Sequence, residues 1–274
     1  MYISVDMGGT NTRVAGIQDL ESIDYVDEPV RRRNTMNYEN DLDFIVESAR
    51  KIAGREAIKA VGIGTPGTPN PDRTRIASAI HLPFWNDQPL TEPISESLDC
   101  PVFFENDAVT AGLGEAYYGN QQSDFHYLIW GTGMGGASIE RDEDGKVSYV
   151  EKLNWREHFY EWGVDCCGAG IEKKYGRAPE TLSEEEWHRV RVKFGAHLLK
   201  YVENFGPDAM VFGGGLADKH RDYVESFARL AQIDVSVSDF GNDSGIVGSF
   251  GLIRYEIDRP QDAPRYDTLA DVEE

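Results

Sequence analysis

The sequence predicts an α/β protein built from two similar lobes that face one cleft. Short apolar runs of strand length alternate with longer segments in which apolar residues recur at helical spacing. The order strand, glycine-rich turn, strand occurs twice, over residues 2–17 and again over residues 126–140. The chain has 274 residues, 40% of them hydrophobic, which is enough for one large or two modest domains.

The composition excludes several classes of partner. Forty-eight acidic residues against 27 Lys and Arg give a formal charge of −21, which repels nucleic acid and anionic lipid. Any phosphate site must therefore be local, built from backbone N–H groups, a metal and a few cations. No apolar run approaches the roughly 20 residues that span a bilayer. Three cysteines and no signal-peptide pattern lead us to expect a cytoplasmic protein with reduced thiols, no nucleic-acid partner and no membrane.

Each lobe is expected to contain strands and helices in alternation. The strands are predicted at residues 2–6, 13–17, 60–64, 101–104, 126–130, 137–140, 209–212 and 234–237. The helices are predicted at residues 41–53, 90–98, 108–118, 183–204, 218–230 and 245–257. We expect lobes over residues 1–107 and 108–244, a last helix at about 245–258 that packs back on the first lobe, and an acidic, frayed tail over 259–274.

The first chemical element is the glycine-rich turn that follows the first strand. Gly8 and Gly9 allow the backbone to approach an anion closely, and Thr10 and Asn11 add neutral donors. Asp6, at the strand end, is suited to hold a hydrated Mg²⁺. The alternative is a tight hairpin that binds nothing.

Two further glycine-rich segments follow predicted strands. Gly131, Thr132 and Gly133 open a turn with four glycines in six residues, which suits a second phosphate loop but also an ordinary turn. The run Gly213–Gly215 would allow a flat ligand such as a nucleotide base and ribose to approach closely; the alternative is a loop that enters a helix.

The fourth element lies between a buried strand and a helix rich in small residues. Asp107 could accept the proton of a hydroxyl that attacks a phosphorus atom, and Asn106 could hydrogen-bond a neighbouring hydroxyl. The alternative is that Asn106 or Asp107 caps the helix.

Taken in this order, the four elements resemble the sugar-kinase fold shared by hexokinase, actin and the heat-shock chaperone ATPases, and more narrowly the ROK family. The chain matches that family's D-x-G-G-T-x-x-R, G-x-G-x-P-G, E-N-D-A and G-T-G-x-G-G motifs, and it resembles the N-L-P-x-W segment and the final G-x-x-G-A helix. These stretches begin at residues 6, 62, 105, 131, 82 and 245. The resemblance covers residues 3–257, nearly the whole chain.

This resemblance implies two ribonuclease H-like lobes of the actin and hexokinase type around a nucleotide cleft. It implies an ATP-dependent kinase, with Mg²⁺, for a primary hydroxyl of a hexose, with glucose as the default. Asp107 would be the catalytic base. The sugar would be bound by Asn106, Glu151, Glu172, Gly67 and His81; the nucleotide by Gly8, Gly9, Thr10, Asn11, Arg13, Gly131, Thr132, Gly133 and Gly213–Gly215. A homodimer is a possible assembly.

The chain departs from the family where ROK kinases hold a structural zinc ion with one His and three Cys. Here the C-x-C spacing is replaced by the adjacent Cys166 and Cys167, and Ile171 stands at the last Cys position. The His position falls on Asn154, unless His158 takes it with a shifted register. We therefore expect no zinc site. In the same rebuilt segment, Glu157 or Glu161 could replace Glu151 as the acid that binds the sugar.

Three other functions compete with a glucose kinase. Some ROK proteins are repressors, but the first strand begins at residue 2, which leaves no room for a preceding helix-turn-helix, and the acidic charge disfavours DNA. A non-catalytic sugar sensor would explain the altered zinc motif but not the retained Asp107. A kinase for fructose, mannose, N-acetylmannosamine or N-acetylglucosamine is also open.

Overall fold

The structure is a computed structural model that describes residues 1–259. In this part of the chain, no helix combines the length and apolar character needed to cross a membrane. The chain forms two compact units. The first contains Met1–Asn120 and the segment that begins at Asp243, and the second contains Gln121–Asn242.

The first unit is built on a five-stranded sheet with the order β3-β2-β1-β4-β7. The strands are β1 (Tyr2–Met7), β2 (Asn11–Ile17), β3 (Val30–Arg33), β4 (Ala60–Thr65) and β7 (Val102–Asn106). Strands β1, β2 and β3 pair antiparallel, whereas β1, β4 and β7 run parallel. The carboxyl ends of β1, β4 and β7 therefore lie at one edge of the sheet.

The second unit repeats this pattern with the order β10-β9-β8-β11-β12. Its strands are β8 (Phe125–Trp130), β9 (Met134–Arg141), β10 (Val147–Lys152), β11 (Ala209–Gly213) and β12 (Asp234–Val237). Again the first three strands are antiparallel and the last two run parallel to the first. The repeated topology confirms the predicted α/β fold with two ribonuclease H-like lobes.

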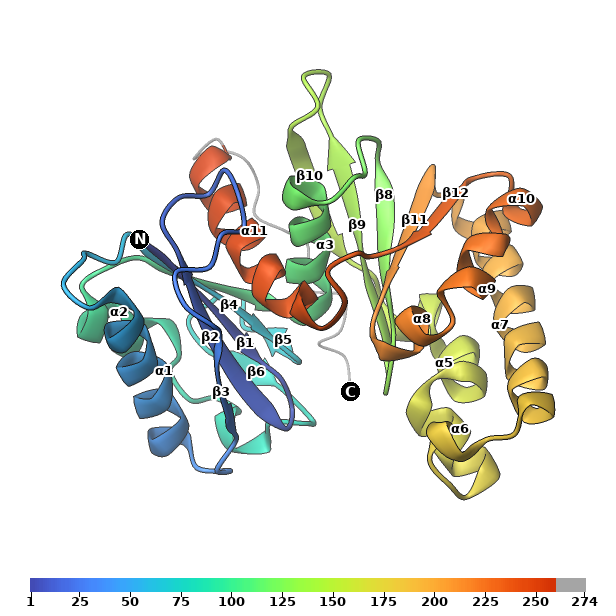
Figure 1. Ribbon diagram of the computed structural model, residues 1–274, viewed down its shortest axis with the longest axis horizontal. Helices are drawn as coiled ribbons and strands as arrows, with labels where there is room; N and C mark the ends of the chain where they lie inside the picture. The colour runs from blue at the N-terminus through green and yellow to red at the C-terminus, as the bar shows by residue number, and fades with distance from the viewer. Residues whose placement is uncertain (260–274) are drawn as a thin grey trace. The chain divides into compact units, whose positions relative to one another are not determined.

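Helices cover both faces of the first sheet. Helices α1 (Tyr38–Ala53) and α2 (Thr91–Leu98) pack on one face, where Ile45, Ile94 and Trp85 are buried. Helices α3 (Asp107–Tyr118) and α11 (Ser244–Asp258) lie side by side on the other face, as Figure 1 shows. A small hairpin of β5 (Thr68–Pro69) and β6 (Ile76–Ser78) and the 3₁₀ turn η1 (Pro83–Trp85) complete this unit.

Close backbone contact explains why α3 belongs to the first unit. A methyl group on Gly114 would lie 2.9 Å from the Cα atom of Gly248, and one on Gly251 would lie 2.6 Å from the carbonyl carbon of Leu113. The two helices therefore approach through glycine. We expected the lobe boundary after Asp107; in the structure the first unit extends through α3 to Asn120.

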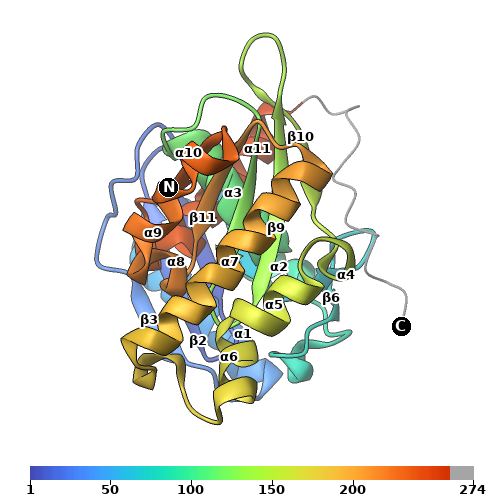
Figure 2. The ribbon, with the colours of Figure 1, turned by 90° about the vertical axis from the view of Figure 1, so that its right-hand side faces the viewer.

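The helices of the second unit pack around a cluster of aromatic side chains. Figure 2 shows the long helix α7 (Glu184–Phe205) running across this unit, with α5 (Tyr160–Cys166) beside it. Trp130 of β8 stacks on Phe194 of α7 with ring centroids 4.0 Å apart. Ser183 caps α7 in a capping box with Glu186, as the run of acidic residues after it predicts. The other helices are α4 (Trp155–His158), α6 (Gly168–Tyr175), α8 (Gly215–Lys219), α9 (Arg221–Ser226), α10 (Ala228–Ala231) and the 3₁₀ turns η2 (Pro179–Thr181) and η3 (Gly241–Asp243).

The helix predicted over residues 218–230 was wrong as a single element. It is divided into α8, α9 and α10, with breaks at His220 and Phe227. Both side chains turn inward: the His220 ring lies 4.2 Å from Trp187, and Phe227 fills the space that Gly195 leaves on α7. Strands β3 and β10 and helices α4 to α6 were not predicted. From residue 260 on, the expected acidic tail lies outside the described residues.

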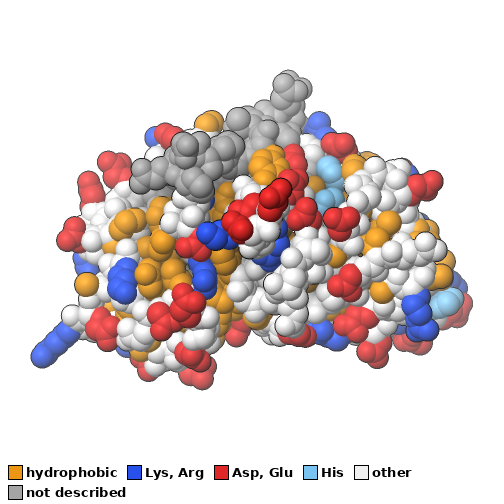
Figure 3. Space-filling model, turned by 90° about the horizontal axis from the view of Figure 1, so that it is seen from above, with side chains coloured by type: hydrophobic (Ala, Val, Ile, Leu, Met, Phe, Trp, Pro, Cys, Tyr) orange, Lys and Arg blue, Asp and Glu red, His pale blue; other side chains and the backbone are white. Residues whose placement is uncertain are grey.

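The acidic composition is visible on the surface. On the face shown in Figure 3, Asp and Glu side chains are scattered widely, and Lys and Arg are sparser. This distribution agrees with the formal charge of −21 and supplies no extended basic patch on this face.

Candidate active site

The first glycine turn joins β1 to β2 and uses part of its backbone internally. The N–H of Gly8 donates to the carbonyl oxygen of Asn11 over 2.9 Å. Asn34 fixes the turn from β3's end, because its N–H donates to the Thr10 carbonyl and its Nδ2 to the Gly8 carbonyl. Gly9 and Thr10 are exposed. The groups that remain suited to bind an anion are therefore at Gly9 and Thr10, rather than at Gly8.

His81 lies directly against this turn. A methyl group on Gly9 would be only 2.9 Å from the Cβ atom of His81. The close approach of His81 therefore explains why residue 9 has no side chain. From the sequence, this glycine was expected to make room for a ligand. His81 is exposed and belongs to the first unit, so its imidazole stands beside the turn expected to hold phosphate.

Asp6 and Arg13 form a tight ion pair at the base of the same hairpin. The Arg13 Nε and Nη2 groups donate to Oδ2 of Asp6 over 3.0 and 2.7 Å, and Nη1 donates to Asp243 over 3.0 Å. A side chain at Gly245 would collide with the Asp6 carboxylate at 2.5 Å. Oδ2 of Asp6 is therefore committed to Arg13, while carboxylate chemistry at Oδ1 fits a hydrated Mg²⁺.

At the carboxyl end of β7, Asn106 begins helix α3. Its Oδ1 accepts the N–H of Ala108 over 3.0 Å, and its Nδ2 donates to the Gly67 carbonyl over 2.8 Å. The side chain of Asn106 is 6% exposed. The capping role set out as an alternative is therefore present, and it locks the loop at Gly67 to the start of α3. The side-chain oxygen and the side-chain nitrogen of Asn106 each retain capacity for one further hydrogen bond.

Asp107 is the first residue of α3 and is half-buried. Its Oδ1 accepts the N–H of Ala108 over 2.9 Å, and Thr110 donates its hydroxyl to the Asp107 carbonyl. A carboxylate at the first turn of a helix is stabilised by the free N–H groups there. The helix thus holds Asp107 at the edge of the sheet where β1 and β4 also end.

Gly67 serves packing as well as this contact. A side chain at Gly67 would meet the carbonyl oxygen of Ser78 at 2.8 Å and the Cβ atom of Ala79 at 2.9 Å. Glycine at this position therefore follows from the close approach of the β5–β6 hairpin. Gly67 contacts the candidate site through its carbonyl oxygen, which accepts the hydrogen bond from Asn106.

In the second unit, the turn between β8 and β9 is held by helix α6. The N–H of Gly131 donates to the Gly133 carbonyl over 3.1 Å within the turn. The N–H groups of Gly168 and Ala169 donate to the carbonyl oxygens of Gly131 and Thr132 over 2.8 and 2.9 Å. Thr132 and Gly133 are exposed, and a methyl group on Gly133 would meet nothing within 4 Å. This turn retains open backbone at Thr132 and Gly133.

The three glycines after β11 serve different purposes. A side chain on Gly213 would overlap the Tyr127 hydroxyl at 1.9 Å, and one on Gly214 would lie 2.7 Å from the Trp130 carbonyl oxygen. Gly214 also has φ +95°, which disfavours any other residue. Only Gly215 is exposed with open space around it. Of the three, Gly215 is therefore the one suited to ligand approach.

The two predicted sugar-binding acids of the second unit lie on separate elements. Glu151 is half-buried in β10, opposite Ser138 of β9. Glu172 is exposed on α6, whose first residues hold the Gly131–Gly133 turn. Glu172 is thus anchored through α6 to a predicted phosphate loop.

The thiols of the rebuilt segment have structural partners. Cys166 is fully buried, and burial raises the pKa of its thiol to about 12, so it remains protonated. The sulfur of Cys167 caps α6 by accepting the N–H of Gly170 over 3.4 Å. His158 is oriented by the Asn154 carbonyl and stacks on Phe205. Within residues 1–259, no three His, Cys, Asp or Glu side chains gather to hold a metal ion.

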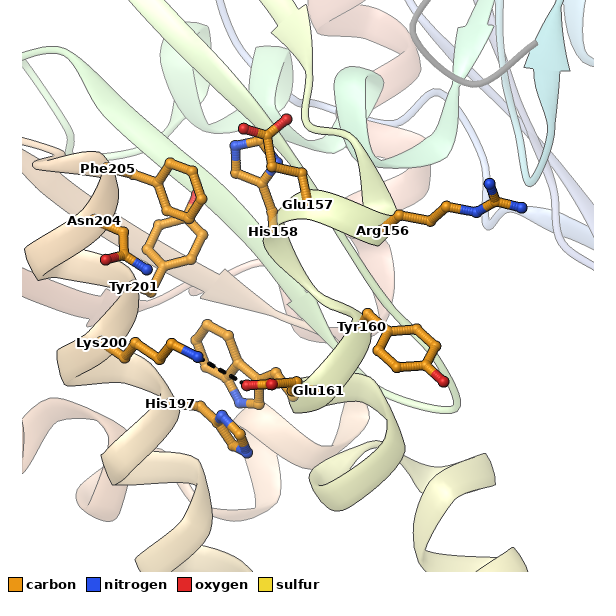
Figure 4. Close-up of a pocket in the computed structure, with 11 residues that line it drawn as sticks. Arg156, Glu157, His158, Tyr160, Glu161, His197, Lys200, Tyr201, Asn204 and Phe205 are labelled. Carbon is orange, nitrogen blue, oxygen red and sulfur yellow. Dashed lines mark hydrogen bonds and ion pairs between the residues drawn. The ribbon is translucent and has the colours of Figure 1, made fainter. Parts of the chain in front are cut away.

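A pocket of about 270 Å³ lies beside the rebuilt segment, between α4–α5 and α7. Figure 4 shows Glu161 reaching Lys200 across it; the two groups are 2.9 Å apart, and the lysine lowers the pKa of the carboxyl. Glu157 and Glu161, the alternative sugar-binding acids, both line this pocket. Glu151 and Glu172 are not among its lining residues.

The model of the ROK family matches residues 2–145, just over half of the chain. The chain belongs to the ROK family. Among related proteins, the glucokinase of Streptomyces coelicolor is 34% identical, and that of Thermotoga maritima is 30% identical. Each alignment covers 93% of this chain and 98% of the relative.

Solved ROK structures share the fold over nearly the whole chain. The ROK family glucokinase from Streptomyces griseus, solved in complex with glucose and AMPPNP, matches with a TM-score of 0.69. The match covers 92% of this chain and 98% of that one at 19% sequence identity. At this identity the likeness establishes the fold.

Sequence reasoning missed several residues that shape this ROK protein's candidate site. They are Asn34, which fixes the first glycine turn, Gly168, which holds the second, and Arg73, which pairs with Glu105. Asn34 and Arg73 lie in connecting segments with no motif. Gly168 lies in the rebuilt segment, and the close approach that favours glycine there is to Gly131 and Thr132, which are distant in the sequence.

Proposed function

We propose that the protein is an ATP-dependent hexose kinase that phosphorylates a primary hydroxyl group, with glucose as the principal substrate. The observation that carries this proposal is the extent of the match: two glucokinases at least 30% identical align with 93% of the chain. The presence of Asp107 at the start of α3, on the edge where the parallel strands end, supports a catalytic role within that match.

In the first unit, the exposed backbone of Gly9 and Thr10 donates N–H groups to the phosphates of ATP. Arg13 and Asp6 brace this turn, and Asp6 would hold a hydrated Mg²⁺ through its carboxylate. When bound, Mg²⁺ neutralises charge on the phosphate oxygens. Asn106, Gly67 and His81 orient the sugar on the same unit.

In the second unit, Thr132 and Gly133 donate backbone N–H groups to phosphate, and Gly215 accommodates the base and ribose. Glu151 and Glu172 accept hydrogen bonds from sugar hydroxyls. Because α6 carries Glu172 and also holds the glycine turn, one helix positions both the sugar contact and the phosphate contact in this unit.

A homodimer and a cytoplasmic location stay predictions of this proposal.

The chemical step needs one proton acceptor. Asp107 accepts the proton of the primary hydroxyl while the hydroxyl oxygen attacks the γ-phosphorus. The bond between the γ-phosphorus and the oxygen that bridges it to the β-phosphorus breaks. The products are ADP and a hexose phosphate. A positioned base contributes about 10²–10⁴-fold, and alignment of the reactants and charge neutralisation supply most of the remaining acceleration.

A sugar panel tests this function. The purified protein is assayed for ADP release with MgATP and glucose, fructose, mannose, N-acetylmannosamine or N-acetylglucosamine. We expect the highest kcat/KM with glucose. If another sugar gives a higher kcat/KM, that sugar and not glucose is the principal substrate. A folded protein that binds sugar but transfers phosphate to none of them would be a non-catalytic sugar sensor.

A further inference from the structure

Glu105, beside the candidate catalytic residues, carries a carboxylate with no exposure to solvent. It lies at the end of β7, opposite Gly64 of β4, and its relative exposure is 0%. A carboxylate so deeply buried requires a countercharge and hydrogen bonds. Arg73 supplies them: its Nε donates to Oε2 of Glu105 over 2.7 Å, and the arginine side chain is itself only 9% exposed.

The loop that delivers Arg73 is closely organised. Arg73 has φ +53°, a left-handed conformation that is unfavourable for a residue with a side chain. Asn70 holds this conformation, since its carbonyl accepts the Arg73 N–H and its Oδ1 accepts the N–H groups of Thr74 and Arg75. A network that maintains an unfavourable backbone to place one guanidinium indicates a specific task for that group.

The second oxygen of Glu105 reaches the site. Oε1 accepts the backbone N–H of Asn106 over 2.8 Å. The same carboxylate therefore links the Arg73 guanidinium to the last peptide of β7, whose N–H belongs to Asn106, one residue before Asp107. Asn106 is in turn fixed to Gly67 by its side chain.

We propose that Arg73 is a positioning residue for phosphoryl transfer: through the buried Glu105 carboxylate it sets the backbone from which Asn106 and Asp107 project. This inference rests on the proposed kinase function. Arg73 does not need to touch the substrates for this role. Its loss displaces Asp107 from the attacking hydroxyl, and a displacement of about 1 Å can lower turnover by about 100-fold.

The test compares Arg73→Met, Glu105→Gln, the double variant and Arg73→Lys with the control Arg75→Met. Arg75 lies two residues away in the same loop, is exposed, and undergoes the same chemical change. Arg73→Met strands a buried charge and is at risk of unfolding. The double variant removes both charges of this pair at once, so it keeps the test valid. Thermal unfolding and circular dichroism establish that each variant is folded at the assay temperature.

We expect the folded double variant to lose about 10- to 100-fold in kcat, with KM for ATP changed less than about 3-fold because Gly9, Thr10 and Thr132 are untouched. Arg73→Lys should recover part of the loss, and Arg75→Met should match the wild type. The losses in kcat of Arg73→Met and Glu105→Gln should not add, because both substitutions break the same ion pair.

A folded double variant with wild-type kcat would overturn the positioning role and leave the kinase function standing. So would a loss that follows only the unfolding temperature. A wild-type protein that phosphorylates no sugar would overturn the kinase function and this role together.

Discussion

The backbone N–H of Gly168 donates to the carbonyl oxygen of Gly131 over 2.8 Å, which joins the start of α6 to the glycine turn between β8 and β9. Ala169 repeats the contact with Thr132. The two carbonyl groups are directed toward α6, so the peptide N–H groups that follow them in the turn point away from it. A helix start thus sets the conformation of the turn proposed to bind phosphate.

Gly168→Ala should weaken ATP binding. A methyl group there would lie 3.1 Å from the Cα atom of Thr132 and 3.3 Å from the Gly131 carbonyl oxygen, so the turn must shift. We expect KM for ATP to rise about 3- to 10-fold, which corresponds to about 0.6–1.4 kcal/mol. Ala169→Ser, which retains the backbone N–H on an exposed residue, is the control. An unchanged KM for ATP in Gly168→Ala would separate α6 from nucleotide binding.

Gly133→Ala should affect ATP binding, whereas Gly214→Ala should affect stability. Gly133 has open space around it, so its substitution should leave the unfolding temperature unchanged but raise KM for ATP about 10-fold if phosphate occupies that space. Gly214 has φ +95° and lies against the Trp130 carbonyl, so its substitution should destabilise the second unit by at least about 1–3 kcal/mol. Thermal unfolding and initial rates measure both effects. Wild-type kinetics in Gly133→Ala would place the phosphates elsewhere.

Asp107→Asn should remove turnover while the protein remains folded. The amide oxygen can still accept the Ala108 N–H, so the start of α3 is preserved, but the side chain can no longer take up a proton. We expect kcat to fall by about 10²–10⁴-fold, with binding of sugar and ATP largely retained. Asp99→Asn, an exposed residue in the same unit, should behave as wild type. Substantial kcat in Asp107→Asn would show that another group takes the proton.

The repeated strand and glycine turn could be predicted because they are local patterns. Runs such as residues 2–6 and 126–130 have strand periodicity, and the glycine clusters that follow mark turns. Those runs became β1 and β8, the first strands of two sheets with the same order. Local signals therefore sufficed for the architecture of both units.

Contacts between distant residues could not be predicted in the same way. Nothing near Arg73 indicates that it pairs with Glu105, 32 residues later. The lack of a side chain at Gly9 and Gly214 was assigned to ligand approach, whereas a side chain at either position would collide with a neighbour within the same unit, His81 or Trp130. Glycine shows that space is needed, and only the structure shows what occupies that space.

His126 makes the stability of the second unit dependent on pH. It lies in β8, where its Nδ1 is 2.7 Å from the Tyr201 hydroxyl. Burial lowers the pKa of His126 to about 4, and the nearby His158 acts in the same direction. Between that value and an ordinary histidine pKa of about 6.5, the unfolded chain binds a proton that the folded chain does not. Stability therefore rises with pH across this window, by up to about 1.4 kcal/mol per unit.

His126→Gln should flatten this dependence, because glutamine can hydrogen-bond the Tyr201 hydroxyl but cannot take up a proton in this range. Urea unfolding followed by tryptophan fluorescence from pH 4.5 to 7.5 measures the slope. His220, whose pKa is also lowered to about 4 by burial, remains in the variant and keeps part of the slope. His188→Gln, the same substitution at an exposed residue of α7, is the matched control. Equal slopes in His126→Gln and wild type would mean that His126 takes up its proton equally in the folded and unfolded chain.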